Sequence, residues 1–332
     1  MSRLLGWSKK HRALSLLLLL PLFFVLLGPI LVVLLPDEVV VAAVVEAVLL
    51  SSPRWSMLIW VFSGLWLAGI HRQWKAGAGL FVFSLLLLGW PFAGRGEGLL
   101  VISANVQAYT DSAEELEAAL ARERADVVLT IERRGERIAG MHRVGDNYQQ
   151  GLKKASHGMA FFCREGLRCQ AWVSPLIGAE SCSMPVGFLR IEEAICLIGI
   201  HVPPPVPICA TGRKPYVDWV VQRIEDGRVA ADVGPCRQGD AVLAAGDFNA
   251  TQGSWTTRAF LEEGLWDPQY HRGVYASTWP AGGGWPNLPV FRLDHAFAGA
   301  VAITGIQQFR LPKADHKALR IWIDSEELDS VR

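Results

Sequence analysis

The first 95 residues consist of long apolar runs separated by short polar stretches. Residues 13–35 form one uninterrupted apolar run, which at a helical rise of about 1.5 Å per residue can cross a hydrocarbon core of about 30 Å. Tryptophans, which favour the membrane interface, flank the later runs. The run 39–50 is shorter, carries Glu46 and is expected to lie at the interface. We therefore predict a membrane anchor over residues 1–95 with transmembrane helices at 13–35, 55–71 and 76–93.

Basic residues set the expected orientation of this anchor. They gather in the N-terminal tail and in the loop that holds Arg72 and Lys75, whereas the intervening loop holds only Arg54. Because basic loops stay in the cytoplasm, the multi-pass anchor is predicted to place the chain beyond residue 95 outside the cytoplasmic (inner) membrane, in the periplasm or extracytoplasmic space. A crossing by residues 39–50 would reverse this orientation. The other interpretation is a cleaved signal peptide, although run 13–35 is longer than the apolar core of such peptides.

After residue 95 the pattern changes to short apolar runs of strand length, separated by amphipathic stretches of helical period. This alternation predicts an α/β domain over residues 96–332. Strands are predicted at 99–104, 126–131, 194–200, 241–245, 290–297 and 319–323, together with a hairpin formed by 158–163 and 167–173. Helices are predicted at 112–125, 214–229 and 256–263.

Polar side chains directly follow several of the predicted strands. Asn105, Glu132 and His201 each come after an apolar run, and Asp247 and Asn249 follow another in the sequence GDFNA. Ligands of α/β sheets bind at the carboxyl edge of the strands, so we expect these side chains to converge. Further polar residues lie within or before the last two predicted strands, at Asp294, Asp315 and His316.

The converging set is rich in oxygen ligands, includes two histidines and lacks a thiolate. Such donors suit a hard divalent cation, Mg²⁺ or Mn²⁺, better than zinc. The whole chain has a formal net charge of +0 and a mean hydropathy of +0.25. Seven basic and three acidic residues precede residue 76, so the remainder carries a charge of −4. This acidic balance is not typical of domains that clamp long nucleic acids by their phosphates.

The order of these features resembles the endonuclease/exonuclease/phosphatase superfamily, whose members share the DNase I-like fold. The features are a strand ending in Asn, a strand ending in Glu, and the motifs IGIHVPPP, GDFNA, RLDH and ADH. They cover residues 98–325. With the N-terminal anchor, the triple proline and the Thr-Trp-Pro of residues 278–280, the chain looks most similar to the bacterial membrane-anchored, YafD-like branch. The resemblance implies a four-layer α/β/β/α sandwich of two mixed sheets.

The resemblance also implies a role for each polar residue. Glu132 and Asn105 would hold or position the metal, and Asp315 would support its ligand shell. Asp247 and Asn249 would orient the attacking water and the phosphate.

Two histidines complete the implied site. His201 would donate to a phosphate oxygen, and Asp294 would fix the imidazole of His316. Either Asp247 or His316 would be the base, and the sequence leaves both open. Trp279, in a long loop rich in Gly and Pro, is a candidate substrate contact or, equally, the anchor of that loop.

The predicted function is that of a membrane-anchored, Mg²⁺-dependent hydrolase that cleaves a phosphodiester or phosphomonoester with an activated water. Its substrate would be a nucleic acid or a lipid head group, and the acidic balance and the membrane anchor favour a substrate near the bilayer. The alternative is a catalytically silent membrane sensor or binding module on the same fold. The sequence indicates no protein partner.

All six cysteines lie in the globular part, and an even number suits an oxidising compartment. Cys163 and Cys169 lie symmetrically about a glycine in the predicted hairpin, and Cys209 and Cys236 bracket the predicted helix 214–229. These are the two expected pairs. Buried free thiols are the other interpretation.

Overall fold

The computed structural model describes residues 96–106, 113–132, 137–147, 158–178, 182–192, 194–268, 277–281 and 291–324. The chain divides into two units, Met1–Trp90 and Pro91–Arg332, and everything described below belongs to the second. The expected transmembrane helices and the segment 39–50 lie outside the described residues. Within the described part of the chain, no helix is long and apolar enough to cross a membrane.

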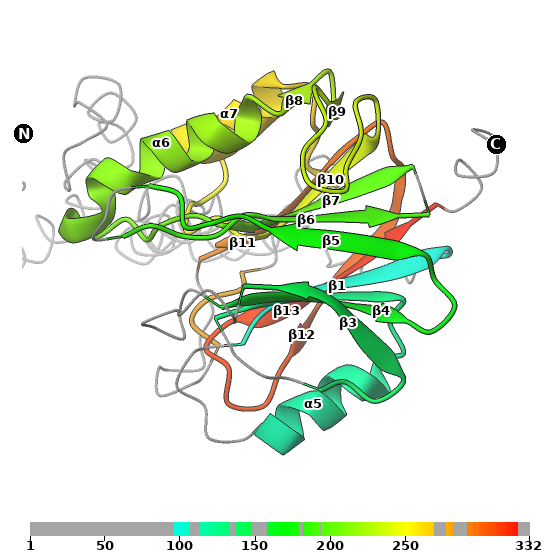
Figure 1. Cartoon of the computed structure of the whole chain (residues 1–332). Coiled ribbons are helices and arrows are strands. Elements are labelled where there is room, and N and C mark those ends of the chain that lie inside the picture. Colours follow the sequence, from blue (N-terminus) through cyan, green and yellow to red (C-terminus); the bar gives the residue numbers. More distant parts are fainter. Residues whose placement is uncertain are drawn as a thin grey trace, which may run out of the picture. The chain divides into compact units, whose positions relative to one another are not determined.

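Two mixed β-sheets form the body of this unit (Figure 1). The first sheet has the order β12-β13-β1-β2-β4-β3, with strands at Ile303–Arg310, Lys317–Ile323, Leu99–Asn105, Val127–Ile131, Met159–Arg164 and Met141–Asp146. The second has the order β5-β6-β7-β10-β9-β8, at Cys169–Val173, Gly187–Ile191, Ile195–His201, Ala241–Asp247, Arg228–Val229 and Ile224–Glu225. Strand β11 (Asp294–Gly299) also pairs with β10. Each sheet contains one parallel pair, β1 with β2 and β7 with β10.

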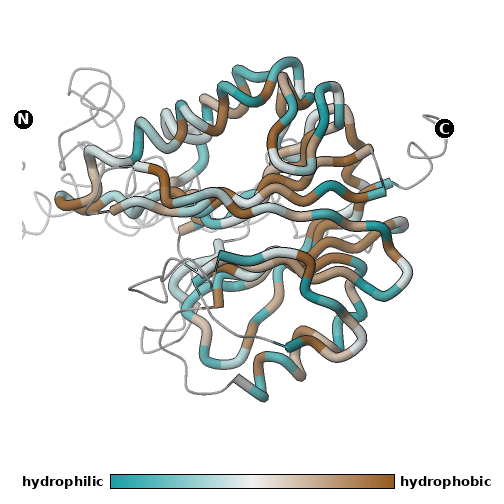
Figure 2. The backbone as a smooth tube through the Cα atoms, in the orientation of Figure 1, coloured by the Kyte–Doolittle hydropathy of each residue, from teal (hydrophilic) through white to brown (hydrophobic). Residues whose placement is uncertain are grey.

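The helices cover the outer faces of the two sheets (Figure 1). Helix α5 (Ala113–Arg122) lies against the first sheet, and α6 (Ala210–Val221) and α7 (Trp255–Glu262) lie against the second. A short 3-10 turn, η5 (Pro207–Cys209), leads into α6. Apolar side chains pack between the sheets and beneath the helices, and Figure 2 shows the hydrophobic stretches concentrated along the strands. These layers are consistent with the expected α/β/β/α sandwich.

The four strands that lead to the polar residues are buried on both faces. Every residue of β2, β7 and β10 is buried, and β1 has only one half-buried position. Strands covered on both faces read as continuous apolar runs, because no position along them faces water. This burial explains why the sequence predicted these strands within one or two residues of their observed ends.

Two predicted elements differ from the structure. The hairpin of 158–163 and 167–173 is wrong, because β4 pairs with β2 and β3 whereas β5 pairs with β6 in the other sheet. The predicted helix 214–229 is also wrong in extent, since α6 ends at Val221 and β8 and β9 follow it. These two short strands are joined at Asp226 and Gly227, both of which have positive φ, so the backbone reverses there and cannot continue the helix.

Disulfides join all six cysteines, and no cysteine among the described residues is free. The expected Cys163–Cys169 pair is confirmed, and because β4 and β5 belong to different sheets it links the two sheets. The expected pairing of Cys209 with Cys236 is wrong, because these residues bond instead to Cys182 and Cys196. Cys209 lies at the start of α6, whereas Cys236 follows β9 and bonds to Cys196 on β7.

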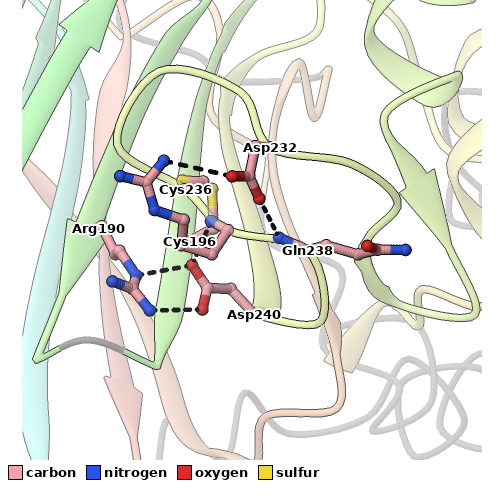
Figure 3. The surroundings of a disulfide bond; sticks show 7 residues. Arg190, Cys196, Asp232, Cys236, Gln238 and Asp240 are labelled. Carbon is pink, nitrogen blue, oxygen red and sulfur yellow. Dashed lines mark hydrogen bonds and ion pairs between the residues drawn. A yellow bond between two sulfur atoms is a disulfide. The ribbon is translucent and has the colours of Figure 1, made fainter.

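The Cys196–Cys236 disulfide fixes the loop that leads into β10. Figure 3 shows it beside Arg190 and Asp240, whose side chains form a two-point ion pair at 2.8 and 3.1 Å. Cys196 lies on β7, next to β10 in the second sheet. The loop is therefore tied to β7, the strand that pairs with β10 and carries His201.

Candidate active site

The polar residues that follow the buried strands meet at one edge of the sandwich. In the first sheet Asn105 lies opposite Ile131, so Glu132 extends just beyond it. In the second sheet His201 lies opposite Asp247. The side-chain nitrogen Nδ2 of Asn105 donates to Asp247 Oδ2 at 3.0 Å, and this hydrogen bond joins the two sheets at this edge. The predicted convergence of the strand ends is therefore present.

Glu132 is held by two donors, one from each sheet. Asn105 Nδ2 donates to Glu132 Oε1 at 3.1 Å, and His201 Nε2 lies 3.3 Å from the same oxygen. Burial alone raises the pKa of Glu132, but the hydrogen bond and charge of His201 and the bond from Asn105 outweigh it and lower this pKa to about 2. Conversely, burial lowers the pKa of His201, but Glu132 and Asp247 outweigh it and raise this pKa. Glu132 is thus ionised at neutral pH.

Asp247 and Asn249 form a tight turn at the end of β10. The backbone amide of Asn249 donates to Asp247 Oδ1 at 2.8 Å, and its side chain donates to the Val202 carbonyl at 2.9 Å. Asn249 has a φ of 46°, a left-handed conformation that Asn tolerates better than most residues. Position 246, just before Asp247, must be glycine, because a Cβ there would lie 2.0 Å from the Ile200 carbonyl oxygen. The GDFN sequence therefore supplies the residues that this turn needs.

His316 and Asp294 form a buried pair across the same edge. Nδ1 of His316 lies 2.8 Å from Asp294 Oδ2, and Nε2 lies 3.8 Å from Asp247 Oδ2. The hydroxyl of Thr278 accepts hydrogen bonds from the Leu293 and Asp294 amides and fixes the backbone that carries Asp294. Burial lowers the pKa of His316, but the charges of Asp294 and Asp247 raise it to about 10. Burial raises the pKa of Asp247 to about 6.

Asp315 and Trp279 are half-buried neighbours of this cluster. Burial raises the pKa of Asp315, whereas the charge of His316 and a hydrogen bond with the Trp279 side chain act against that rise. The Trp279 ring also lies 6.0 Å from that of Phe291, and the two residues form a backbone bridge. Trp279 therefore packs against Phe291 and hydrogen-bonds to Asp315, and its expected contact with substrate stays a prediction.

Two groups of side chains offer ligand atoms close enough to hold a metal ion. They are Glu132, His201 and Asp247, and Asp247, Asp294 and His316; within each group the ligand atoms lie within 4.8 Å of one another. Asp247 belongs to both groups. Carboxylate oxygens predominate and no thiolate is present among them, which fits a hard divalent cation. Asp315, expected in the metal shell, belongs to neither group among the described residues.

A second buried polar network, which the sequence did not predict, lies behind this site. Arg292 Nη2 contacts Asp267 Oδ1 at 2.8 Å, and both side chains are only 4% exposed. Nε2 of His295 lies 2.8 Å from the Ala250 carbonyl oxygen. The one available signal was the position of Arg292 and His295 within the largely apolar run VFRLDHAF, which is predicted as a strand.

Comparison with known proteins is consistent with these features. The sequence profile described as the Endonuclease/Exonuclease/phosphatase family matches residues 102–316. No curated protein matches the chain significantly.

Solved structures resemble the chain at low sequence identity. The endonuclease domain of TRAS1, a telomere-specific non-LTR retrotransposon, is 17% identical, with a TM-score of 0.46 over 69% of this chain and 99% of that domain. An AP endonuclease from Leishmania major is 15% identical, with a TM-score of 0.49 over 68% of this chain and 87% of its own. A Neisseria 3′ phosphatase bound to a product DNA hairpin is 11% identical, with a TM-score of 0.49 over 68% of this chain and 100% of its own.

Proposed function

This chain belongs to the endonuclease/exonuclease/phosphatase family, and we propose on that basis that it is a divalent-metal-dependent phosphoesterase. The observation that carries the proposal is the buried cluster in which Asp247 is shared by Glu132 and His201 on one side and by Asp294 and His316 on the other. A phosphate ester is hydrolysed by an in-line water, a base, and positive charge or donors at the phosphoryl oxygens. The cluster offers a residue for each of these tasks.

The positions and charges of Asp247 and His316 support a division of the proton-transfer roles. Asp247, with a pKa of about 6, is ionised at neutral pH and can accept a proton from a water at the site. His316, with a pKa of about 10, retains its proton and presents positive charge to a phosphoryl oxygen. We therefore assign the base to Asp247 and electrostatic stabilisation to His316.

The remaining side chains bind and position. The carboxylate of Glu132 and the side-chain oxygen of Asn105 would hold a Mg²⁺ or Mn²⁺ ion, with Asp315 supporting its ligand shell. When bound, such an ion supplies Lewis-acid stabilisation of charge on the phosphoryl oxygens. Asn249 orients the phosphate, and His201 contributes a further hydrogen-bond donor.

We further propose that residues 1–95 anchor this domain to the outer side of the cytoplasmic membrane. The apolar runs and the distribution of basic residues support this topology. The three disulfides support it as well, because such bonds persist in oxidising compartments. An alkaline phosphatase reporter fused after Arg332 is expected to be active. A silent reporter in a stably expressed fusion would place the domain in the cytoplasm.

Exposed apolar residues near the site favour a lipid head group as the substrate. The loop that follows His201 reads VPPPVPIC, and Val206, Pro207 and Ile208 are exposed, Ile208 by 66%. Figure 2 shows this turn into α6 as hydrophobic. It leaves the sheet at the edge where His201 and Asp247 lie. An exposed apolar surface of this kind is typical of a contact with a lipid or another apolar surface.

The proposal is tested by hydrolysis with the purified full chain. Plasmid DNA, RNA, sphingomyelin, bis-p-nitrophenyl phosphate and phosphomonoesters would be compared with and without Mg²⁺, using Glu132→Gln as the matched variant. We expect Mg²⁺-dependent cleavage, lowered at least about a hundredfold in the variant. A different outcome is that the wild-type chain binds the metal, Glu132→Gln abolishes this binding, and no ester is hydrolysed. That outcome would indicate a catalytically silent binding module.

A further inference from the structure

His295 lies immediately behind the active site, on the opposite face of β11 from Asp294. Side chains alternate along a strand, so Asp294 reaches His316 while His295 points into the core beneath the helices. The His295 ring is fully buried and packs against Phe248 and Phe297, at centroid distances of 5.4 and 5.6 Å. The reaction assigned above does not use this imidazole, so its burial calls for a separate explanation.

The contacts of the His295 ring define its orientation. A carbonyl oxygen can only accept, so the 2.8 Å contact with Ala250 means that His295 Nε2 carries the hydrogen and donates it. On the other side of the ring, Nδ1 faces Asp267 Oδ2 at 3.9 Å. Asp267 is in turn paired with the buried guanidinium of Arg292. With its hydrogen on Nε2, the neutral ring has no hydrogen at Nδ1, which makes no hydrogen bond, so the bond to Ala250 is the one that orients the ring among the described residues.

Ala250 follows Asn249 in the turn that carries the catalytic groups. On the side of the site, two hydrogen bonds hold this turn. The backbone amide of Asn249 donates to the Asp247 carboxylate, and the Asn249 side chain donates to the Val202 carbonyl oxygen. From the opposite side, the His295 bond holds the Ala250 carbonyl. Asn249 adopts a left-handed conformation with a φ of 46°, so the backbone reverses sharply just before Ala250.

We propose that His295 is a positioning residue that holds the turn of Asn249 and Asp247 in its reactive geometry through its hydrogen bond to Ala250, while Phe248 and Phe297 pack against the imidazole. The inference rests on the proposed function for its effect on turnover. His295 is separated from the site by the β11 backbone, so it acts through the turn and touches neither substrate nor metal. Loss of the His295 hydrogen bond leaves the attacking water less precisely oriented. This raises the energy of the transition state and lowers kcat.

Two substitutions separate the hydrogen bond from the packing. His295→Phe keeps an aromatic ring against Phe248 and Phe297 but cannot donate to Ala250. His295→Gln places its amide nitrogen where Nε2 lies and can still donate. We expect kcat to fall about tenfold in His295→Phe, the effect of one lost hydrogen bond, with KM within about threefold of wild type. His295→Gln is expected to restore kcat to within about threefold. If His295→Phe does not fold, His295→Asn removes the same donor.

A double-mutant cycle distinguishes positioning from general destabilisation. If His295 acts through this turn, the loss caused by His295→Phe is smaller in an Asn249→Ala background, because the turn has already lost the Asn249 bond to Val202 that helps to hold it. A merely structural role gives the same fold-loss in both backgrounds, and that result would overturn the proposal. Equal kcat in His295→Phe and His295→Gln would overturn it as well.

Hydrogen exchange at the Asn249 amide tests the tether without any activity. We expect exchange about tenfold faster in His295→Phe than in wild type, and unchanged in His295→Gln. If the wild-type chain hydrolyses no phosphate ester, the proposed function fails while this comparison still decides the role of His295. Unchanged exchange in a folded His295→Phe protein would refute the tether whatever the activity.

Discussion

Replacing Asp294 with Asn tests how the site controls the charge of His316. The substitution keeps the shape of the side chain at the 2.8 Å contact with Nδ1 but removes its negative charge. A close opposite charge shifts a pKa by about 1 to 3 units. We therefore expect the pKa of His316 to fall from about 10 by that amount in Asp294→Asn. Since one pKa unit corresponds to about 1.4 kcal/mol, the His316–Asp294 pair contributes about 1.4 to 4 kcal/mol to the free energy of unfolding while His316 is protonated.

The sign of the pH dependence follows from the direction of the shift. The pKa of His316 is higher in the folded protein, about 10, than its ordinary value of 6.5. Its stabilisation is therefore complete below pH 6.5 and is lost as the pH rises through 10. Wild-type protein should lose unfolding free energy across that window. Asp294→Asn should lose less, by about 1.4 to 4 kcal/mol, because its folded pKa lies nearer to the unfolded value.

An NMR titration of labelled histidines in the metal-free protein measures the pKa directly, and denaturant unfolding at several pH values measures the free energy. Asp232→Asn is the matched control, since its carboxylate pairs with Arg237 at the surface and is 63% exposed. Surface pairs contribute less than about 1 kcal/mol, so this control should behave as wild type. If His316 titrates at the same pH in Asp294→Asn and in wild type, the pairing argument is refuted.

Three further predictions concern stability and are measured by denaturant unfolding. Asp267→Asn leaves the buried Arg292 guanidinium without its counter-charge and should lower the unfolding free energy by about 3 to 5 kcal/mol; a change below about 1 kcal/mol would contradict the buried pair. Gly246→Ala should destabilise by several times as much as Gly253→Ala, because both have positive φ but only Gly246 lacks space for a Cβ. Cys196→Ser removes a cross-link across 40 residues and should cost about 4 kcal/mol, whereas an unchanged midpoint would mean that the bond is not formed.

The sequence predicted the parts of the fold in which burial is nearly complete. The strands before Asn105, Glu132, His201 and Asp247 read as continuous apolar runs because both faces are covered. Strands β3, β6 and β12 were missed, and in β3 and β12 most positions are only partly buried, so their sequences mix polar and apolar residues without a clear period. The predicted hairpin failed because a short turn does not reveal whether the chain stays in one sheet or crosses to the next.

The candidate site was predictable because its polar residues directly follow apolar strands. Parallel neighbours bring such residues to one edge, and this places Asn105 with Glu132 and His201 with Asp247. The closure of one sheet against the other, which brings His316 to Asp294, depends on tertiary packing. The same holds for the Asp267–Arg292 pair, whose members lie 25 residues apart and whose contact no local pattern encodes.

The rate of bis-p-nitrophenyl phosphate hydrolysis by wild type and Asp247→Asn, each with and without Mg²⁺, tests the central claim most directly. Asp247 is the residue shared by both clusters and the assigned base. The proposed mechanism predicts Mg²⁺-dependent hydrolysis by wild type and a loss of at least about a hundredfold in the folded variant. Near-full activity in Asp247→Asn, or equal rates with and without metal, would contradict it.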